Sequence, residues 1–437
     1  MSARLDRETT DWLARQRWFA AKTRRITEAV IEDRIPFANA DVCLVRVRLD
    51  DGTSDRYVAA LSSDAAVLDA FDDAAFCRGL LGLMAGASTA QGERGMLRGQ
   101  RSRAFPRELP RDVGVRRLRG EQSNTSVVFD GAVIVKHFRR LTEGENPELE
   151  ITRFLTEHTT YRNTPRLAGA LEYVDAGGGT STLAVAQELV PDARDGWQWL
   201  LARLAAGDGA LDALRRLGRR TGELHLALAA PTADPAFGTD AIAGRDVATW
   251  TAAVESQVTA ARAAAAGIRL PEVPAAAAAA LSGLLGASKS RHHGDFHLGQ
   301  TLCLRDGADF MLIDFEGEPL RPLAERRRKH TPLRDVAGML RSFAYAAATT
   351  SRAGHAVGDW ESDARAAFLD GYRAATGSAA FIPASDGAFA RAVAALELEK
   401  AAYEIVYEAN NRPDWIDIPV RGFVSATASL ARLAGAA

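Results

Sequence analysis

The sequence predicts an α+β fold in two lobes, strand-rich in its first part and largely helical in its second. Within the first 190 residues, short apolar runs alternate at period two and are joined by Asp-Gly turns, which is typical of β-hairpins. From residue 192 onward, apolar residues recur at helical spacing, as in the leucine stripe between Leu211 and Leu228. A buried strand that ends in a proline, Leu183 to Pro191, marks the change of pattern.

Length and composition limit the class of protein. A chain of 437 residues is too long for one hydrophobic core, so we expect two or three domains or lobes. Hydrophobic residues make up 47% and charged residues 25%, as in globular proteins. The formal net charge of −2 shows no basic excess, and we therefore expect no nucleic-acid partner.

The cysteines and the apolar segments bear on location. Cys43, Cys77 and Cys303 are widely separated and lack metal-ligand spacing, which favours reduced thiols. The first residues run directly into charge without an apolar leader segment. No apolar run approaches the roughly 20 residues of a membrane span. We expect a cytoplasmic protein that does not associate with membranes, and the sequence is silent on its oligomeric state.

Residues 1–90 predict a small N-terminal cap unit. Its expected elements are a helix over 11–19, strands over 42–49 and 57–61 joined by Asp50-Asp51-Gly52, and a helix over about 65–83. Residues 86–103 carry Gly, Ser and Gln with little pattern, so we place a boundary there.

Residues 91–190 predict an intermediate, nucleotide-binding unit. A strand is expected over 113–118, followed by a hairpin over 127–136 around Asp130-Gly131. The connection Gly120-Glu121-Gln122-Ser123-Asn124-Thr125-Ser126 offers amides and hydroxyls that suit phosphate groups, with Ser123, Asn124 and Thr125 as candidate ligands. It lacks repeated glycines, and an ordinary polar hairpin loop is the alternative.

Lys136 ends a β-branched run just before an expected helix over 147–157. A lysine on such a strand can contact the α- and β-phosphates and pair with a helix glutamate. We choose Glu150 as its partner, with Glu148 as the competitor. Glu188, Leu189 and Val190 lie where the strand-rich part passes into the helical part, and we call them the hinge residues. Their backbone is the candidate adenine contact.

Residues 191–437 predict the helical lobe. His225 lies beside the leucine stripe and is interpreted as a core histidine rather than a ligand. An alanine-rich segment over 250–280 predicts helices interrupted at Pro271 and Pro274. The basic run 323–330 is interpreted as a solvated surface. Asp335, at the start of the following helix, is expected to brace the preceding loop through a hydrogen bond.

The chemistry is concentrated in two stretches. One is His293-Gly294-Asp295-Phe296-His297-Leu298-Gly299-Gln300, and the other is an apolar strand that ends in Asp314-Phe315-Glu316. Phosphoryl transfer with the kinase layout needs a catalytic-loop carboxylate, an amide metal ligand and a metal-binding carboxylate after the next hairpin. Asp295 is our candidate for orienting the acceptor hydroxyl and accepting its proton. A plain β-hairpin with acidic turns is the alternative.

Oxygen donors indicate Mg²⁺ as the metal. Gln300, Asp314 and Glu316 are the candidate ligands, with Glu316 on the same side as Asp314 if the strand continues. His292, His293 and His297 raise zinc as an alternative, but the stretch lacks cysteines, and we expect these histidines to hold the loop backbone.

Together these stretches resemble the bacterial maltokinases, which are aminoglycoside-phosphotransferase-like kinases with the eukaryotic-protein-kinase-like fold. Further segments share the resemblance, which extends along the whole chain: Gln16-Arg17-Trp18-Phe19, Glu121 to Ser126, Asp335 to Phe343, and Tyr403 to Pro419. The resemblance implies ATP, Mg²⁺, an N-terminal cap unit, an intermediate nucleotide-binding unit and a helical C-terminal lobe. Gln300 stands where more distant phosphotransferases carry Asn, which keeps the amide oxygen.

The acceptor is predicted from residues near the C-terminus. The candidate contacts, with Asp295, are His297, Tyr403, Glu404, Glu408, Trp415 and Asp417. In maltokinase-like chains we expect a neutral residue at the position of Asp417, so an added acid indicates a cationic acceptor. The chain is thus similar to a glucosamine kinase branch of actinobacteria. Maltose is the alternative acceptor, and an aminoglycoside kinase and an inactive binding module are less favoured.

Overall fold

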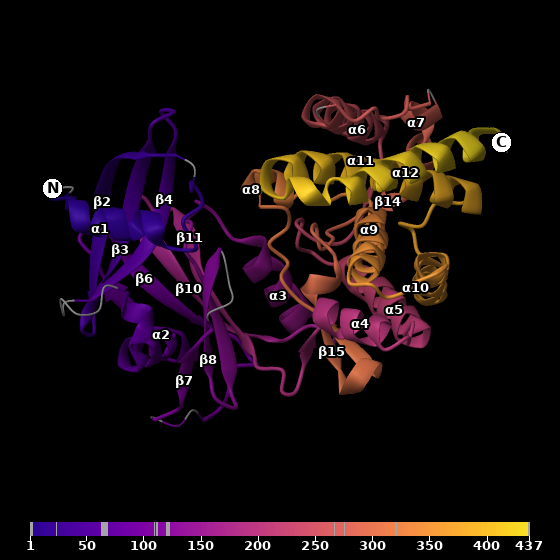
Figure 1. The fold of residues 1–437 in the computed structure, drawn as a ribbon. Coiled ribbons are helices and arrows are strands. Elements are labelled where there is room, and N and C mark those ends of the chain that lie inside the picture. Colours follow the sequence, from indigo (N-terminus) through magenta and orange to yellow (C-terminus); the bar gives the residue numbers. More distant parts are fainter. Residues whose placement is uncertain are drawn as a thin grey trace. The chain divides into compact units, whose positions relative to one another are not determined.

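The computed structural model describes residues 3–22, 24–62, 69–108, 110, 112–118, 123–265, 267–274, 276–319 and 321–435. The chain divides into two compact units, Met1–Pro191 and Asp192–Ala437 (Figure 1). The first is rich in strands and the second in helices, so the predicted α+β class is confirmed. No helix in the described part of the chain is both long and apolar enough to span a bilayer.

The first unit begins with an antiparallel sheet in the order β1-β2-β3-β4. Its strands, with the helix that precedes β2, are β1 (Ala3–Arg4), α1 (Arg7–Arg15), β2 (Ile26–Phe37), β3 (Ala40–Leu49) and β4 (Ser54–Ser62). Leu13, Trp18 and Phe19 pack on one face of this sheet. The helix expected over 11–19 spans Arg7–Arg15 instead, so Trp18 and Phe19 follow it. The hairpin around Gly52 is confirmed.

A second antiparallel sheet follows, in the order β5-β6-β10-β11-β9-β8-β7. Its strands are β5 (Thr89–Gln91), β6 (Gly95–Arg101), β7 (Val115–Arg117), β8 (Asn124–Phe129), β9 (Val133–Phe138), β10 (Leu167–Asp175) and β11 (Thr180–Glu188). The helices of this part are η1 (Ala70–Asp72), α2 (Ala74–Ala85) and α3 (Pro147–His158). The hairpin around Gly131, the helix at 147 and the last strand are confirmed.

The patternless boundary expected at 86–103 is wrong, because β5 and β6 occupy it. Its glycine is a packing feature: a Cβ on Gly99 would lie 2.0 Å from the carbonyl oxygen of Leu83 in α2. α2 packs directly on β6, so a glycine at position 99 is required by the close contact and does not indicate a loop. The helix predicted from 65 begins at Ala74, after the Asp73 cap; residues 63–68 lie outside the described residues.

One buried arginine joins the two sheets of the first unit. Arg139 is fully buried, and its guanidinium donates to Asp69, to Thr125 of β8 and to the carbonyl of Val58 in β4. Its Cζ lies 4.7 Å from the centroid of the Trp18 ring and 4.3 Å from that of the Phe71 ring. Cation–π contacts and paired donors offset the desolvation of this charge.

Helices dominate the second unit. They are α4 (Gly196–Ala205), α5 (Leu211–Leu228), α6 (Gly244–Ala264), α7 (Ala276–Ala279), α8 (Leu323–Arg326), α9 (Leu333–Arg352), α10 (Trp360–Thr376), α11 (Asp386–Asn411) and α12 (Asp417–Gly435). α11 packs along α12 and α6, and α5 packs against α10 (Figure 1). The glycines of the α5–α10 contact allow close approach: a Cβ on Gly218 would lie 1.9 Å from the carbonyl oxygen of Phe368.

Two small sheets hold the loops of this unit. Their strands are β12 (Arg194–Asp195), β15 (Thr301–Leu304) and β16 (Asp309–Leu312) in one, and β13 (Asp240–Ala241) and β14 (Ser288–Lys289) in the other. β15 and β16 form the hairpin that follows the predicted catalytic loop, so the predicted strand at 310 is confirmed. This hairpin fixes the position of Asp314, which lies two residues beyond the end of β16.

Candidate active site

Asp335 in the first turn of α9 holds the loop that carries Asp295. Its Oδ2 accepts the amide N–H of His293 at 2.7 Å, and its Oδ1 accepts that of Gly294 at 2.9 Å. Two charge-assisted hydrogen bonds fix the backbone on the N-terminal side of Asp295. The predicted bracing role of Asp335 is confirmed.

A second layer fixes Asp335 itself. His225 of α5 is fully buried, with Nε2 2.9 Å from Asp335 Oδ2 and Nδ1 3.0 Å from the Tyr372 hydroxyl. Burial alone would raise the pKa of Asp335, but the hydrogen bond from His225 and the neighbouring imidazoles keep that pKa below its ordinary value. Asp335 is therefore an anion at neutral pH, and the interpretation of His225 as a core residue is confirmed.

The loop also meets the segment that follows Asp314. Gly294 has a φ of +89°, and a Cβ there would lie 3.3 Å from Cα of Gly317. His293 Nε2 lies 2.8 Å from the carbonyl oxygen of Ile313, and its ring packs against Phe296 and Phe315. His297 caps the next helical turn, η3 (Leu298–Gln300), by accepting the amide of Gly299 at 3.1 Å. The expectation that His293 and His297 hold the loop backbone is confirmed.

Two of the candidate metal ligands lie at the same end of the β15–β16 hairpin. The amide of Ile313 donates to the carbonyl of Gln300 at 3.0 Å, which continues the ladder toward Asp314. Asp314 has a φ of +68°, a conformation that costs energy and is concentrated at functional sites. The strand ends at Leu312, so the argument that an uninterrupted strand puts Glu316 beside Asp314 is wrong. The carbonyl of Glu316 accepts from Arg326 at 2.9 Å.

The side-chain oxygens of Gln300 and Asp314 suit a hard cation whose remaining ligands are not protein groups. Gln300 and Asp314 supply an amide and a carboxylate oxygen, the type of donor that Mg²⁺ prefers. Within the described residues, no three His, Cys, Asp or Glu side chains form a group that could hold a metal ion by themselves. Phosphate oxygens and water would have to complete the shell.

Lys400 of α11 lies beside Asp295. Its Nζ is 3.1 Å from Asp295 Oδ1 and 2.7 Å from Glu318 Oε1. Burial alone would lower the pKa of Lys400, but the carboxylates of Asp295 and Glu318 more than offset this and raise that pKa. Glu318 is also held by Arg321 and Arg334. One oxygen of Asp295 is thus paired with a permanent cation.

Arginines hold two of the candidate acceptor residues on α11. Glu404 accepts a hydrogen bond from Nε of Arg341 at 2.9 Å, and Nη2 of this arginine lies 2.8 Å from the same carboxylate oxygen. Glu408 is buried and accepts from Arg412 at 2.6 Å and from the Tyr345 hydroxyl at 3.0 Å. Burial raises the pKa of Glu404 even though Arg341 opposes the shift.

Trp415 and Asp417 continue this arrangement beyond α11. Trp415 belongs to η5 (Pro413–Trp415), and the Cζ atoms of Arg352 and Arg412 each lie 5.0 Å from its ring centroid. Asp417 pairs with Arg352 and, at 3.2 Å, with Arg421. The structure therefore brings Glu408, Trp415 and Asp417 into one connected group, with arginines between them. Tyr403 is linked instead to Lys400, whose Nζ lies 4.9 Å from its ring centroid.

The candidate nucleotide residues lie in the first unit. Lys136 is on β9, opposite Val185 of β11, and its Nζ lies 5.6 Å from the centroid of the Phe138 ring. Glu150 and Glu148 are both buried in α3, at 6% and 1% exposed, so burial does not decide between them. Glu148 accepts from Gln187 at 2.9 Å. The choice of Glu150 as partner of Lys136 stays a prediction.

Some polar groups of the connection at 120–126 and of the hinge residues 188–190 already form hydrogen bonds within the first unit. Arg119 to Gln122 lie outside the described residues, Ser123 is exposed, and Asn124 and Thr125 begin β8. The Thr125 hydroxyl is buried and accepts from Arg139 at 2.8 Å. At the hinge, the Glu188 amide donates to Arg166 and the Leu189 amide to Ala132. The role of these residues and of Val190 toward a nucleotide stays a prediction.

Sequence reasoning did not assign the cations of the site. Lys400, Arg341 and Arg352 each contact a candidate carboxylate that is more than 60 positions away in the chain. A partial signal exists for Lys400, because it lies one turn before Tyr403 in a helix whose neighbouring positions are buried. The arginines carry no such signal.

Comparison with known proteins places the chain. Residues 12–82 match the maltokinase N-terminal cap domain family. The glucosamine kinase of Mycolicibacterium smegmatis is 33% identical over 321 residues, which are 70% of this chain and 78% of that protein. The chain belongs to the glucosamine kinase family. A second family member, the glucosamine kinase of Streptacidiphilus jiangxiensis, is 29% identical over 394 residues, or 86% of this chain and 81% of that protein.

Solved structures of the family share the fold. A glucosamine kinase in complex with glucosamine, ADP and inorganic phosphate superposes with a TM-score of 0.67 at 22% identity, covering 95% of this chain and 98% of that chain. Another crystal form gives a TM-score of 0.68 with the same coverage. The resemblance inferred from the sequence, to maltokinase-like chains of the glucosamine kinase branch, is confirmed.

Proposed function

We propose that this chain transfers the γ-phosphoryl group of ATP to a hydroxyl of glucosamine and forms glucosamine 6-phosphate. The observation that carries this proposal is the 33% identity with a glucosamine kinase over most of both chains. A structural neighbour that binds glucosamine and ADP supports it. The 6-hydroxyl is chosen because it is the least hindered hydroxyl of a hexosamine.

The proposed architecture is that of aminoglycoside-phosphotransferase-like kinases, which share the protein-kinase fold. Residues 1–90 would be the cap, 91–190 the nucleotide-binding unit and 191–437 the helical lobe. Lys136, paired with Glu150, would contact the phosphates, and the Ser123–Thr125 turn would cover them. The backbone of Glu188, Leu189 and Val190 would contact adenine. Since two of these amides already donate within the unit, the carbonyls and the Val190 amide are the groups to test.

Asp295 would orient the acceptor hydroxyl. In the reaction, the hydroxyl oxygen bonds to the γ-phosphorus, the bond from this phosphorus to the bridging oxygen of ADP breaks, and the hydroxyl proton passes to Asp295. Most of the rate enhancement in such reactions comes from positioning and charge neutralisation. The hydrogen bonds from the His293 and Gly294 amides to Asp335 support this role, because they fix the loop before the substrate arrives.

Gln300 and Asp314 would hold Mg²⁺, with Glu316 as a third ligand directly or through water. The ion would neutralise charge on the β- and γ-phosphates. The positive φ of Asp314 and the hairpin that ends beside it support these two ligands.

Recognition of the amine would fall to the group around Trp415. Asp417 carries Arg352 on Oδ1 and Arg421 on Oδ2, yet a carboxylate offers about four acceptor positions. It therefore keeps capacity for an ammonium group. Maltose is the second candidate acceptor, because residues 12–82 match the maltokinase cap family.

A substrate panel tests the proposal. ATP turnover is measured with glucosamine, glucose, maltose and a set of aminoglycosides, for the wild type and for Asp295→Asn. We expect glucosamine to have the highest kcat/KM and Asp295→Asn to lose at least a hundredfold in kcat. A higher kcat/KM for maltose, or undiminished turnover in the variant, would refute it.

The amine contact has its own test. Asp417→Asn should lower the preference for glucosamine over glucose by roughly tenfold, the value of one charge-assisted contact. Asp414→Asn is the matched control, because Asp414 is exposed and lies in the same turn. Equal preference in Asp417→Asn and the control would exclude this role of Asp417.

A further inference from the structure

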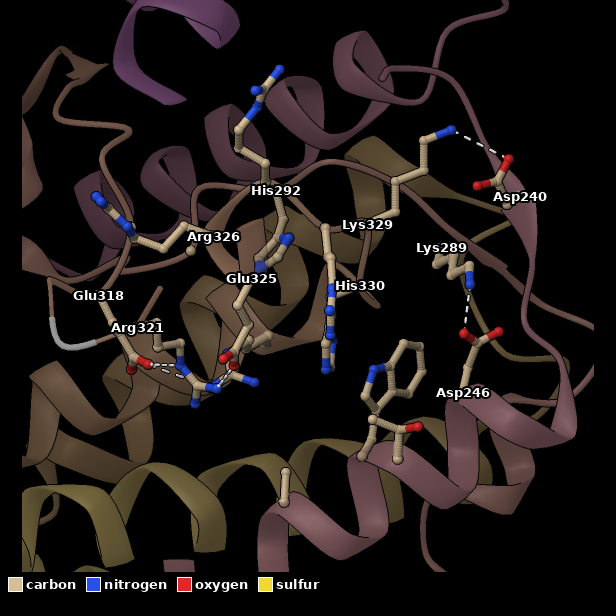
Figure 2. A pocket seen from close by; sticks show the side chains of 18 of the residues that line it. Asp240, Asp246, Lys289, His292, Glu318, Arg321, Glu325, Arg326, Lys329 and His330 are labelled. Carbon is tan, nitrogen blue, oxygen red and sulfur yellow. Dashed lines mark hydrogen bonds and ion pairs between the residues drawn. The ribbon is translucent and has the colours of Figure 1, made fainter. Parts of the chain in front are cut away.

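A cavity of about 540 Å³ lies in the second unit, beside the loop that carries Asp295 (Figure 2). Sites for small organic molecules usually have about 300–1,000 Å³, so the cavity has room for a substituted monosaccharide. The first turns of α6, the loop residues His292 and Gly294, and the segment from Gly317 to Arg334 line it. Three of its arginines already belong to the candidate active site: Arg321 and Arg334 hold Glu318, and Arg326 donates to the carbonyl of Glu316.

The cavity is strongly basic. Among the described residues that line it are eight Lys and Arg side chains and four Asp and Glu side chains. Two of the acids pair with lining lysines: Asp240 with Lys329 at 3.2 Å and Asp246 with Lys289 at 2.5 Å (Figure 2). A concave surface with a net excess of four positive charges concentrates small anions.

The other two acids are paired with Arg321 and Arg334 of the lining, and both of these arginines also pair with Glu399 outside the lining. Arg321 pairs with both Glu318 and Glu325 (Figure 2). Arg245 and Arg328 lie at exposed positions of the lining, and within the described residues no ion pair is formed by either. These two guanidinium groups are the ones best suited to a phosphate, which they can bind in a bidentate manner.

Neutral rings form another part of the wall. The His330 ring stacks on Trp250 with centroids 4.0 Å apart and an interplanar angle of 28°. His292 is only 9% exposed, and within the described residues its Nδ1 has no hydrogen-bond partner. Burial lowers the pKa of His292 to about 4, so the ring is neutral at pH 7 and adds no charge to the wall. A neutral, stacked aromatic part of the wall suits the apolar face of a sugar ring.

We propose that this cavity binds a phosphorylated sugar, with the phosphate monoester at Arg245 and Arg328 and the ring against the Trp250–His330 stack. A cationic acceptor such as glucosamine is disfavoured here by the charge. The site is therefore separate from the acceptor position at Asp295. Because His292 and Gly294 belong to the loop that carries Asp295, the site is placed to report sugar phosphate levels to the catalytic loop.

Calorimetric titration of the full chain tests the proposal. Glucose 6-phosphate is titrated in the presence of saturating glucosamine and ADP, so that the substrate positions are filled, and is compared with glucose and inorganic phosphate. We expect glucose 6-phosphate to bind at least tenfold more tightly than either. Its affinity should fall as salt is raised, since partly exposed charges are screened.

The double variant Arg245→Ser with Arg328→Ser should weaken this binding at least tenfold. Arg432→Ser, an exposed arginine on α12 outside the cavity, is the matched control and should bind as the wild type does. Absence of binding to the wild type, equal affinity in the double variant, or equal affinity for inorganic phosphate would overturn the proposal. So would loss of binding when glucosamine and ADP are added. None of these results depends on which acceptor the enzyme phosphorylates.

Discussion

Replacing Lys400 by methionine removes the cation beside Asp295 and keeps a similar side-chain volume. At 3.1 Å and an effective dielectric constant of about 20, the attraction between the two charges is about 5 kcal/mol before desolvation is subtracted. Both side chains are about one-fifth exposed, so screening is incomplete. A hydrogen bond to a charged group contributes a net of about 1.5–3 kcal/mol. If this energy holds Asp295 in its productive orientation, kcat should fall roughly 10- to 100-fold.

The assay is steady-state kinetics with glucosamine and ATP between pH 5 and 9, with thermal unfolding measured in parallel. A change in KM for ATP of no more than about threefold is expected, because Lys400 contacts Asp295, the proposed catalytic carboxylate, and not a proposed nucleotide residue. Lys400→Arg keeps the charge and should recover much of kcat. A Lys400→Met enzyme with kcat within twofold of the wild type would refute the reasoning.

Three further outcomes follow from the same unit. Asp335→Asn should lower kcat about 100-fold and stability by about 2–4 kcal/mol, because a buried anion with three donors is lost; kinetics and denaturant unfolding measure both, and near-normal kcat would contradict the bracing role. Gly294→Ala should lower kcat more than tenfold, whereas Gly286→Ala, also at positive φ but with open space around it, should affect only stability, by about 1–2 kcal/mol. Because the pKa of His292 is lowered from 6.5 to about 4 in the folded state, its contribution to stability is complete above pH 6.5 and is lost as pH falls toward 4. The melting temperature should therefore drop between pH 6.5 and 5, where most carboxylates stay ionised; a constant value would contradict it.

The arrangement of the proposed catalytic loop and the hairpin after it could be predicted because its parts are close in sequence. Asp295, Gln300 and Asp314 lie within twenty residues, and the hairpin between them has a fixed geometry. Asp335 could be added because it opens the helix that follows this hairpin, 41 positions beyond Gly294 in the chain. α5 and β11 could be predicted because the periodicity of their apolar residues is a local property of the sequence.

Long-range partners could not be predicted. The pairing of Lys400 with Asp295 joins residues 105 positions apart, and no periodic pattern encodes which helix face meets which loop. The arginines that neutralise Glu404, Glu408 and Asp417 raise the same difficulty, so the acceptor group looked more acidic in the sequence than it is in the fold. β6 was missed because Gly99 was taken for a loop residue, although α2 requires it.

The buried Arg139 has a consequence for how this protein can be rearranged by recombination. Its guanidinium lies between Trp18 and Phe71 and donates to Asp69, while its own carbonyl accepts the amide of Val58. A chain cut near residue 90 would leave a charged group in an apolar interior without the acid that neutralises it. The cap segment and the strands that follow it therefore have to be exchanged together. Transplanting the cap from a relative should succeed only when the donor supplies matching groups at the positions of Trp18, Val58 and Asp69.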